Sequence, residues 1–242
     1  MHRLLPRALL ALCAASACLA ASATNLRIVP VLVDPGAGAR TGVVTLTNQE
    51  QSPMRAQFRV MRWTRENGRD VLQPTEDVVV SPPQVTVAPG QDYVVRVVSV
   101  RAPAAGREDS YRLLVDELPD SVTPRRTGTV DLVLRQSFPV FFSDVRNRAA
   151  NVDWNLVREG DNLWLVGRNS GARRLRIADL TFESGGRPVF VKPGLVGYVL
   201  AGSQAQWAVL PRTPLPPGAN VRVKALTDTG DMEVSLVVPP AR

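Results

Sequence analysis

The sequence predicts an all-β protein made of two β-sandwich domains, and three observations lead to this prediction. From Thr24 onward, short apolar runs are interrupted roughly every 8–12 residues by Pro, Gly, Asn or Asp, which is typical of sandwiches. Between Met54 and Met61, apolar residues alternate with mostly basic ones, and this period of two gives a strand one apolar face. No stretch carries the pattern of a long helix.

The first domain, residues 24–144, is expected to contain roughly seven strands. Each is a short apolar or alternating run that ends at a turn of Pro, Gly or Asn, residues that preset φ or accept a positive φ. Such turns lie at 34–36, 66–68, 81–83 and 88–90. The expected strands are 26–33, 42–47, 54–61, 84–87, 93–100, 111–117 and 129–142.

A polar linker at 143–151 separates this domain from a second one, residues 145–242. The domains share a weak echo, because an apolar strand ends at Asn48 or Asn169 and is followed by a polar turn and an Arg-bearing strand. Two related sandwiches fit this echo better than one barrel. The strands expected in the second domain are 152–157, 162–167, 175–182, 188–191, 205–210, 221–226 and 233–238.

Residues 1–23 have the pattern of a secretory signal. Arg3 and Arg7 precede an apolar run at 8–20, and the small residues at 21–23 suit a signal peptidase, so cleavage is expected after Ala23. A less favoured alternative is a lipoprotein acylated at Cys18. No later stretch approaches the roughly 20 apolar residues of a membrane-spanning helix, so no membrane insertion is expected.

Composition excludes most familiar enzyme mechanisms. The single His and both Cys lie within the signal, as His2, Cys13 and Cys18, so the mature chain would lack imidazole and thiol. Ser-His-Asp and Cys-His nucleophile systems, thiol redox chemistry and the usual zinc sites are therefore excluded, and no cofactor or metal is expected. Asp116 and Glu117 cannot act as a catalytic pair, because adjacent strand residues point to opposite faces. We expect a protein that is not an enzyme.

An excess of Arg offers a different interpretation. The chain has a net charge of +7, and five Arg lie between Arg55 and Arg69. This cluster could serve a secreted adhesion or anionic-glycan-binding protein. Glu50, Glu66, Asp70, Glu76 and Asp77 surround it, however, so a solvated strand face is favoured and no nucleic-acid partner is expected.

The expected strand at 129–142 is the most informative one. Its alternating residues Val130, Leu132, Leu134 and Phe138 form one large apolar face, whereas Pro139 has no N–H and indicates that part of the strand lies at a sheet edge. An apolar edge strand aggregates unless a partner pairs with it. The pattern alone leaves a partner-binding edge and an ordinary core strand equally open.

Several stretches resemble the periplasmic pilus chaperones of the chaperone–usher pathway, most closely the archaic, Csu-like branch. The most specific is 110–119 (SYRLLVDELP), which is similar to the signature strand of that family. It is followed by the apolar strand that ends in Phe138, Pro139, Val140 and Phe141. The other similar stretches are 52–64, 72–75, 81–83, 88–91, 94–97 and 197–202.

The resemblance implies two immunoglobulin-like domains in a boomerang, an L-shaped arrangement whose cleft receives an incomplete pilin subunit in the periplasm. The chaperone would donate Val130, Leu132 and Leu134 to the open groove of the subunit and deliver it to an outer-membrane usher. The free protein would be a candidate for a self-capping dimer.

The resemblance also exposes a departure from the family pattern. Family chaperones usually bind the terminal carboxylate of the subunit with a cleft Arg on the first strand and a Lys on the donor strand. Here Pro30 or Leu32 occupies the first place and Pro139 the second, and neither can donate to a carboxylate. The nearest basic substitutes are Arg27 and Arg135.

Overall fold

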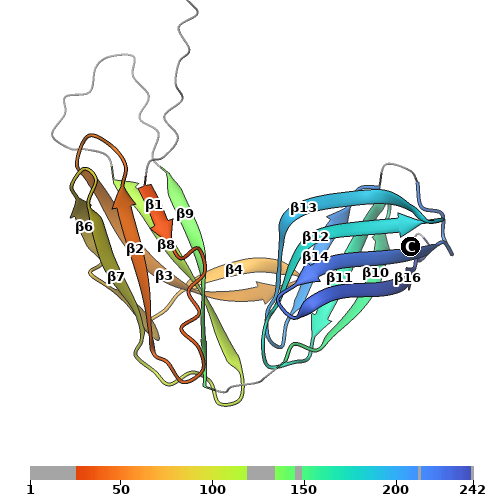
Figure 1. The fold of residues 1–242 in the computed structure, drawn as a ribbon. Helices are drawn as coiled ribbons and strands as arrows, with labels where there is room; N and C mark the ends of the chain where they lie inside the picture. The colour runs from red at the N-terminus through yellow and green to blue at the C-terminus, as the bar shows by residue number, and fades with distance from the viewer. Residues whose placement is uncertain (1–25, 119–133, 145–148, 212–213, 241–242) are drawn as a thin grey trace, which may run out of the picture.

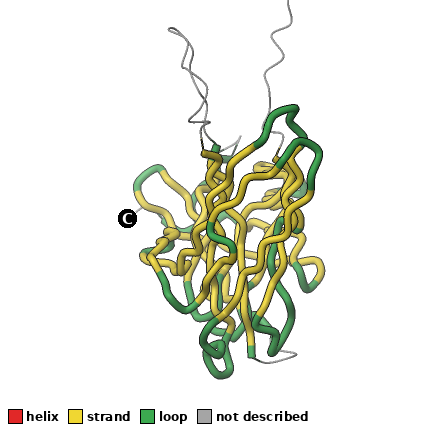
Figure 2. Tube along the Cα trace, turned by 90° about the vertical axis from the view of Figure 1, so that its left-hand side faces the viewer, coloured by secondary structure: helices red, strands yellow, loops and turns green. Residues whose placement is uncertain are grey.

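Sixteen strands and no helix make up the part of the chain that the structure describes, residues 26–118, 134–144, 149–211 and 214–240. The structure is a computed structural model. Figure 1 shows two lobes of strands that meet at an angle, and Figure 2 shows only strands and loops in the described part. The predicted all-β class is confirmed.

The N-terminal lobe is a sandwich of two antiparallel sheets. One has the strand order β1-β2-β7-β5, and the other has the order β4-β3-β8-β9, with β6 paired to β3. Alternating apolar residues meet between the sheets, where Leu46, Phe58, Leu113 and Phe142 are almost completely buried. The strands are β1 (Leu26–Val29), β2 (Thr41–Asn48), β3 (Met54–Glu66), β4 (Arg69–Pro74), β5 (Val78–Ser81), β6 (Gln84–Val87), β7 (Asp92–Ser99), β8 (Glu108–Leu118) and β9 (Arg135–Ser143).

The C-terminal lobe is a second sandwich with its own core. Its sheets have the orders β10-β11-β14 and β13-β12-β15-β16. Leu165, Ile177, Phe182 and Val223 are fully buried between them. The strands are β10 (Val152–Glu159), β11 (Asn162–Asn169), β12 (Leu175–Ser184), β13 (Arg187–Val199), β14 (Gln204–Val209), β15 (Asn220–Thr227) and β16 (Gly230–Val237).

The predicted strand 26–33 is wrong as a single element. β1 ends at Val29, because Pro30 has no N–H for the ladder, and the chain then crosses to the other sheet. There Val33 forms a parallel bridge with Val140 of β9. β4 and β5 were not predicted from the sequence, and β3 and β13 extend beyond the predicted ranges 54–61 and 188–191.

The predicted echo between the two domains has a structural basis in two buried asparagines. Asn48 Nδ2 donates to the carbonyls of Ser52 and Val87, and Asn169 Nδ2 donates to those of Arg173 and Val199. The Oδ1 atom of each accepts from the backbone N–H two residues later. The same side chain therefore closes the same turn in both lobes.

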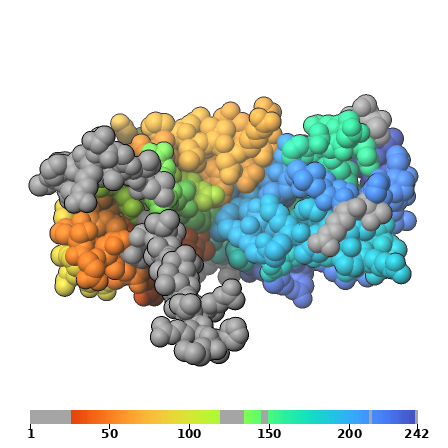
Figure 3. Space-filling model, turned by 90° about the horizontal axis from the view of Figure 1, so that it is seen from above, coloured from red at the N-terminus to blue at the C-terminus, as the bar shows by residue number. Residues whose placement is uncertain are grey.

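At least three sets of contacts between described residues join the lobes. Trp63 and Phe141 of the first lobe pack against Tyr198 and Leu200 of the second, with the Trp63 and Tyr198 rings 5.7 Å apart and edge-on. At the tip of the β3–β4 hairpin, Gly68 lies against Gln206. Figure 3 shows the light-orange surface of this hairpin extending along one side to the second lobe.

The third set is a buried ion network. Arg174 of the second lobe binds Glu108 of β8 through its backbone N–H and its guanidinium, and both side chains are only 3% exposed. A second guanidinium nitrogen lies 2.7 Å from Asp34 Oδ2. The angle between the lobes is thus set by apolar, backbone and ionic contacts.

Candidate functional site

β9 forms an edge of its sheet and pairs on one side with β8. Glu117 N–H donates to the Leu134 carbonyl over 3.0 Å, so the even-numbered residues of the strand direct their backbone groups toward β8. The odd-numbered residues direct theirs outward. The outward N–H and C=O of Arg135 and Ser137 have no backbone partner among the described residues.

From Pro139 onward, the outer edge of β9 already has a backbone partner. Val33 N–H donates to the Pro139 carbonyl, and Phe141 N–H donates to the Val33 carbonyl. Pro139 is therefore an outward position, where a missing N–H costs no bond to β8. The structure confirms the prediction that part of this strand lies at an edge. Only the part of β9 that precedes Pro139 is open.

Of the three predicted donor residues, the structure describes only Leu134, which is partly buried immediately before β9. Val130 and Leu132 lie outside the described residues. Leu134 has the parity of Phe138, Val140 and Phe142, which face the core of the lobe.

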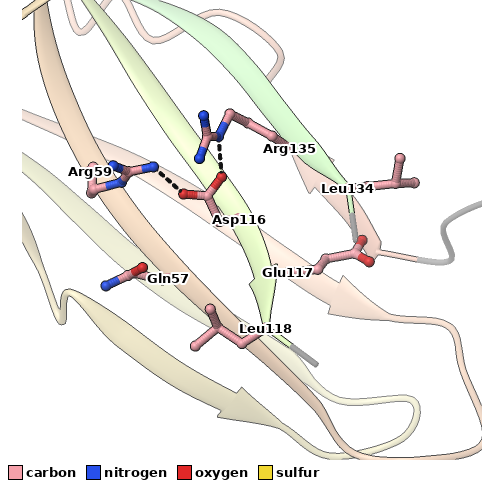
Figure 4. Close-up of a pocket in the computed structure, with 7 residues that line it drawn as sticks. All are labelled: Gln57, Arg59, Asp116, Glu117, Leu118, Leu134 and Arg135. Carbon is pink, nitrogen blue, oxygen red and sulfur yellow. Dashed lines mark hydrogen bonds and ion pairs between the residues drawn. The ribbon is translucent and has the colours of Figure 1, made fainter. Parts of the chain in front are cut away.

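The opposite face of the sheet is ionic at this point. Figure 4 shows Asp116 between Arg59 and Arg135, with Glu117 and Leu134 directed away from them. Burial alone would raise the pKa of Asp116, but hydrogen bonds from Arg135 and Arg59 lower it below the ordinary value. The group lines a hollow of about 450 Å³ at the start of β9.

Glu117 lies on the core-facing side, as the alternation predicts. Its Oε1 is buried with no hydrogen-bond partner among the described residues. Burial raises its pKa, and the nearby Glu50 raises it further. Asp116 and Glu117 therefore face different surroundings, as the alternation of strand residues predicts.

The two predicted anchor residues are not brought together. Arg135 is engaged by Asp116 on the outer face of the β3-β8-β9 layer. Arg27 lies on β1 in the other sheet, between the buried Leu26 and Ile28, so its exposed side chain points outward from that second layer.

A basic residue that the sequence reasoning missed lies in the cleft between the lobes. Arg112 is the register partner of Pro139, and its guanidinium lies 3.8 Å above the ring of Trp63. It forms no ion pair with any described residue. Burial lowers its pKa. The sequence offered one sign of this position. Arg112 lies between apolar residues of a strand, and the alternation of side chains therefore places it on the face away from the core.

The Arg cluster of β3 and β4 is largely neutralised by carboxylates. Arg62 binds Asp77 and lies 3.5 Å from Asp109, while Arg65 lies 3.0 Å from Asp70. The hydrogen bond from Arg62 lowers the pKa of Asp77. Such pairing does not support a polyanion-binding surface.

Residues 25–143 match the model of the pili and flagellar-assembly chaperones, PapD N-terminal domain. The N-terminal lobe is therefore a domain of this chaperone family. The predicted resemblance to the chaperone–usher pathway is confirmed, and the chaperone belongs to a periplasmic and non-enzymatic class. Comparison with curated protein sequences gives no match.

Solved structures share the two-domain, immunoglobulin-like architecture of the chaperone. A chain in the CsuC–CsuE chaperone–tip adhesion subunit complex from the archaic Csu pili of Acinetobacter baumannii matches with a TM-score of 0.67 and 21% identity, covering 87% of this chain and 97% of that one. A chain in the Salmonella enterica complex of the SafA pilin with the SafB chaperone gives 0.62 and 18%, covering 90% and 99%. The Escherichia coli chaperone DraB gives 0.56 and 22%, covering 89% and 98%. The predicted fold of the chaperone is confirmed.

Two further observations concern the described residues of the chaperone. They contain no group of His, Cys, Asp and Glu that could hold a metal ion. They also contain no helix long and apolar enough to cross a membrane.

Proposed function

We propose that this chaperone binds, folds and caps pilin subunits by donor-strand complementation and delivers them to an outer-membrane usher. The observation that carries the proposal is the open edge of β9 in a chain of the pilus chaperone family. The outward backbone groups of Arg135 and Ser137 offer two donors and two acceptors to a strand of another protein. The complexes of CsuC with CsuE and of SafB with SafA support pilins and tip subunits as partners.

The donated side chains are proposed to be Val130, Leu132 and Leu134. They share one parity, so an extended strand would carry all three on the face that Phe138 and Val140 turn into the core. The chaperone and its subunit would then share a continuous apolar layer. Burial of each side chain contributes about 1.5–3 kcal/mol.

The carboxylate of the subunit is proposed to bind Arg112 rather than Arg27 or Arg135. A strand that runs parallel to β9 would end near Pro139, beside Arg112 on the neighbouring strand. An antiparallel strand would bring an ammonium group there instead, which the guanidinium would repel. Arg135 already binds Asp116, and Arg27 lies on the other sheet.

The later steps are part of the same proposal. Exchange for a better-fitting strand of the next subunit would release the pilin without ATP. In the absence of a subunit, the open edge would pair with a second copy and give a self-capped dimer.

The proposal includes export and a division of the chain into domains. Residues 1–23 would act as a cleaved signal for transport through the inner membrane, and 24–144 and 145–242 would form the two domains. Two separate cores support this division. Phe142 belongs to the core of the first lobe, and Ala150 packs against the core of the second.

Co-purification from periplasm tests the proposal. Wild type, Leu132→Arg and the control Leu226→Arg, an exposed Leu of the second lobe, are each co-expressed with pilins encoded beside the gene. Wild type and the control should retain a stoichiometric pilin. Leu132→Arg should lose it, because an unpaired charge cannot enter an apolar groove without a large desolvation cost.

Equal capture by wild type and a folded Leu132→Arg variant would contradict the donor-strand proposal, as would the absence of any captured pilin. Strongly salt-sensitive binding of polyanions by wild type would instead support the alternative, a secreted adhesion or glycan-binding protein.

A further inference from the structure

The outer face of the β3-β8-β9 layer carries a row of side chains that leads to the open edge of β9. Gln57 of β3, Asp116 of β8 and Arg135 of β9 lie in register across the three strands. Neighbouring strands lie about 4.8 Å apart, and register partners place their side chains on the same face. A strand added to the open edge would therefore continue this row, with one of its own side chains beside Arg135.

The charged groups at this end of the row carry one excess positive charge. Both carboxylate oxygens of Asp116 are used, since Oδ1 accepts from Arg135 Nε and Oδ2 lies 2.6 Å from Arg59 Nη2. Burial raises the pKa of Asp116, but the hydrogen bonds from the two guanidinium groups lower it overall, so the carboxylate is ionised at neutral pH. Glu117 also lines the hollow, but Figure 4 shows its side chain directed away from this group. One carboxylate thus faces two guanidinium groups.

Arg135 keeps most of its hydrogen-bonding capacity. Its side chain is 61% exposed, and within the part of the chain that the structure describes only its Nε has a partner. The two terminal guanidinium nitrogens are therefore available to another acceptor. Asp116 lies on the β8 side of Arg135, so a second carboxylate on the side of the open edge would give an alternation of charge across the sheet. Neighbouring strands are stabilised by such opposite charges and destabilised by like charges.

We propose that Arg135 selects client strands by charge, through an Asp or Glu on the outer face of the incoming strand. This inference rests on the proposed function, in which that strand runs parallel to β9 and ends near Pro139. Since Arg135 and Pro139 are four residues apart, the acidic residue would lie four positions before the residue beside Pro139. The charge is read on the face of the sheet opposite to the donated apolar side chains. It is therefore a separate determinant of client choice.

Competition between two forms of one pilin tests the selection. A pilin encoded beside the gene is made with Glu or with Arg at one outer-face position of its last strand, and both forms are co-expressed with the chaperone. Intact-mass spectrometry of the co-purified complexes gives the ratio of the captured forms, and each outer-face position is examined in turn. Wild type should favour the Glu form about threefold or more at the position beside Arg135, because the guanidinium attracts one form and repels the other.

Variants of the chaperone assign the preference to Arg135. Arg135→Gln should abolish the preference, Arg135→Lys should retain part of it, and Arg135→Glu should reverse it in favour of the Arg form. Arg96→Glu is the matched control, because Arg96 is an exposed strand residue of β7 in the other sheet, and it should keep the wild-type ratio. The ratio is measured within each preparation, so a lower yield of a folded variant does not alter it.

If wild type favours neither form, or the Arg form, at every position, the inference is overturned. The same follows if a preference for Glu is unchanged in Arg135→Gln and Arg135→Glu. Failure of the proposed function looks different, because wild type would then co-purify with neither form. A chaperone that captures both forms equally would retain donor-strand complementation and lose the selection by charge.

Discussion

Asp116 is a single carboxylate that holds two guanidinium groups at the start of the open edge. It positions Arg59 of β3 and Arg135 of β9 across three neighbouring strands. Because Asp116 is only 13% exposed, its charge is more important here than in an ordinary surface pair. The pair with Arg135 steadies the residue whose backbone groups begin the open edge.

Acid should remove this contribution to stability. The folded-state pKa of Asp116 is below its ordinary value, so the stabilisation is complete above about pH 4 and is lost as pH falls through the lowered pKa. The free energy of unfolding in urea, measured from pH 6 to pH 2.5, should fall less for Asp116→Asn than for wild type, by about 0.5–1 kcal/mol. Parallel curves for the two proteins would contradict this assignment.

At the residue scale, alternation predicted faces but not partners. It placed Asp116 and Glu117 on opposite sides correctly, because strand geometry fixes the direction of a side chain. It could not single out Arg112, because the ring beneath its guanidinium belongs to Trp63, which is far from it in the sequence. The same limit explains Arg27, which the family resemblance offered as an anchor and the structure places on the other sheet.

At the element scale, β9 combines two kinds of backbone position. Gln136 lies at an even position that bonds to β8, and Ser137 lies at an odd position that faces the open edge. A proline at either place removes one N–H, but the consequences differ because the bonds lost have different partners.

Ser137→Pro should therefore fold normally and lose pilin capture, because it removes a donor from the open edge alone. Gln136→Pro should be destabilised, since it removes a bond to β8. Thermal unfolding and co-purification from periplasm distinguish the two effects. Full pilin capture by Ser137→Pro would show that the outward N–H is not used.

The extent of β1 illustrates what sequence patterns miss at this scale. Residues 26–33 read as one apolar strand, yet the chain leaves the first sheet after Val29 and reaches the second at Val33. Apolar periodicity is the same in both sheets, so it cannot reveal a change of partner. Pro30 was the local sign of the break.

At the scale of the whole molecule, the network of Asp34, Glu108 and Arg174 holds the two lobes in one orientation. Removing the Glu108 charge would leave the buried Arg174 with Asp34 as its remaining ion-pair partner among the described residues, and breaking a buried pair is costly. The exposed pair of Arg222 and Glu233, whose side chains are about half exposed, is a natural control.

Glu108→Gln should cost about 3 kcal/mol or more of stability, whereas Glu233→Gln should cost less than about 0.5 kcal/mol. Urea unfolding gives both values, and small-angle scattering of Glu108→Gln should show a wider range of lobe orientations. Equal and small losses for the two variants would mean that the other contacts between the lobes, such as the aromatic cluster of Trp63, Phe141 and Tyr198, set the angle without the ion network.

The division into two sandwiches was readable from the sequence because it depends on local patterns. Turn residues and alternating runs mark each strand, and the buried Asn48 and Asn169 mark the same turn twice. The angle between the sandwiches was not readable from those patterns. It depends on contacts between residues far apart in the sequence, such as the bond from Arg65 to the Tyr198 carbonyl.

The bridge from Val33 to Pro139 and Phe141 limits how far a strand can extend along the edge of β9. Hydrogen bonds along a strand edge are independent of sequence, so an incoming strand could in principle slide by two residues and still pair. Val33 occupies the edge from Pro139 onward and blocks sliding in that direction. The end of the incoming strand is thus held at one position, and the register of every residue before it follows from that position.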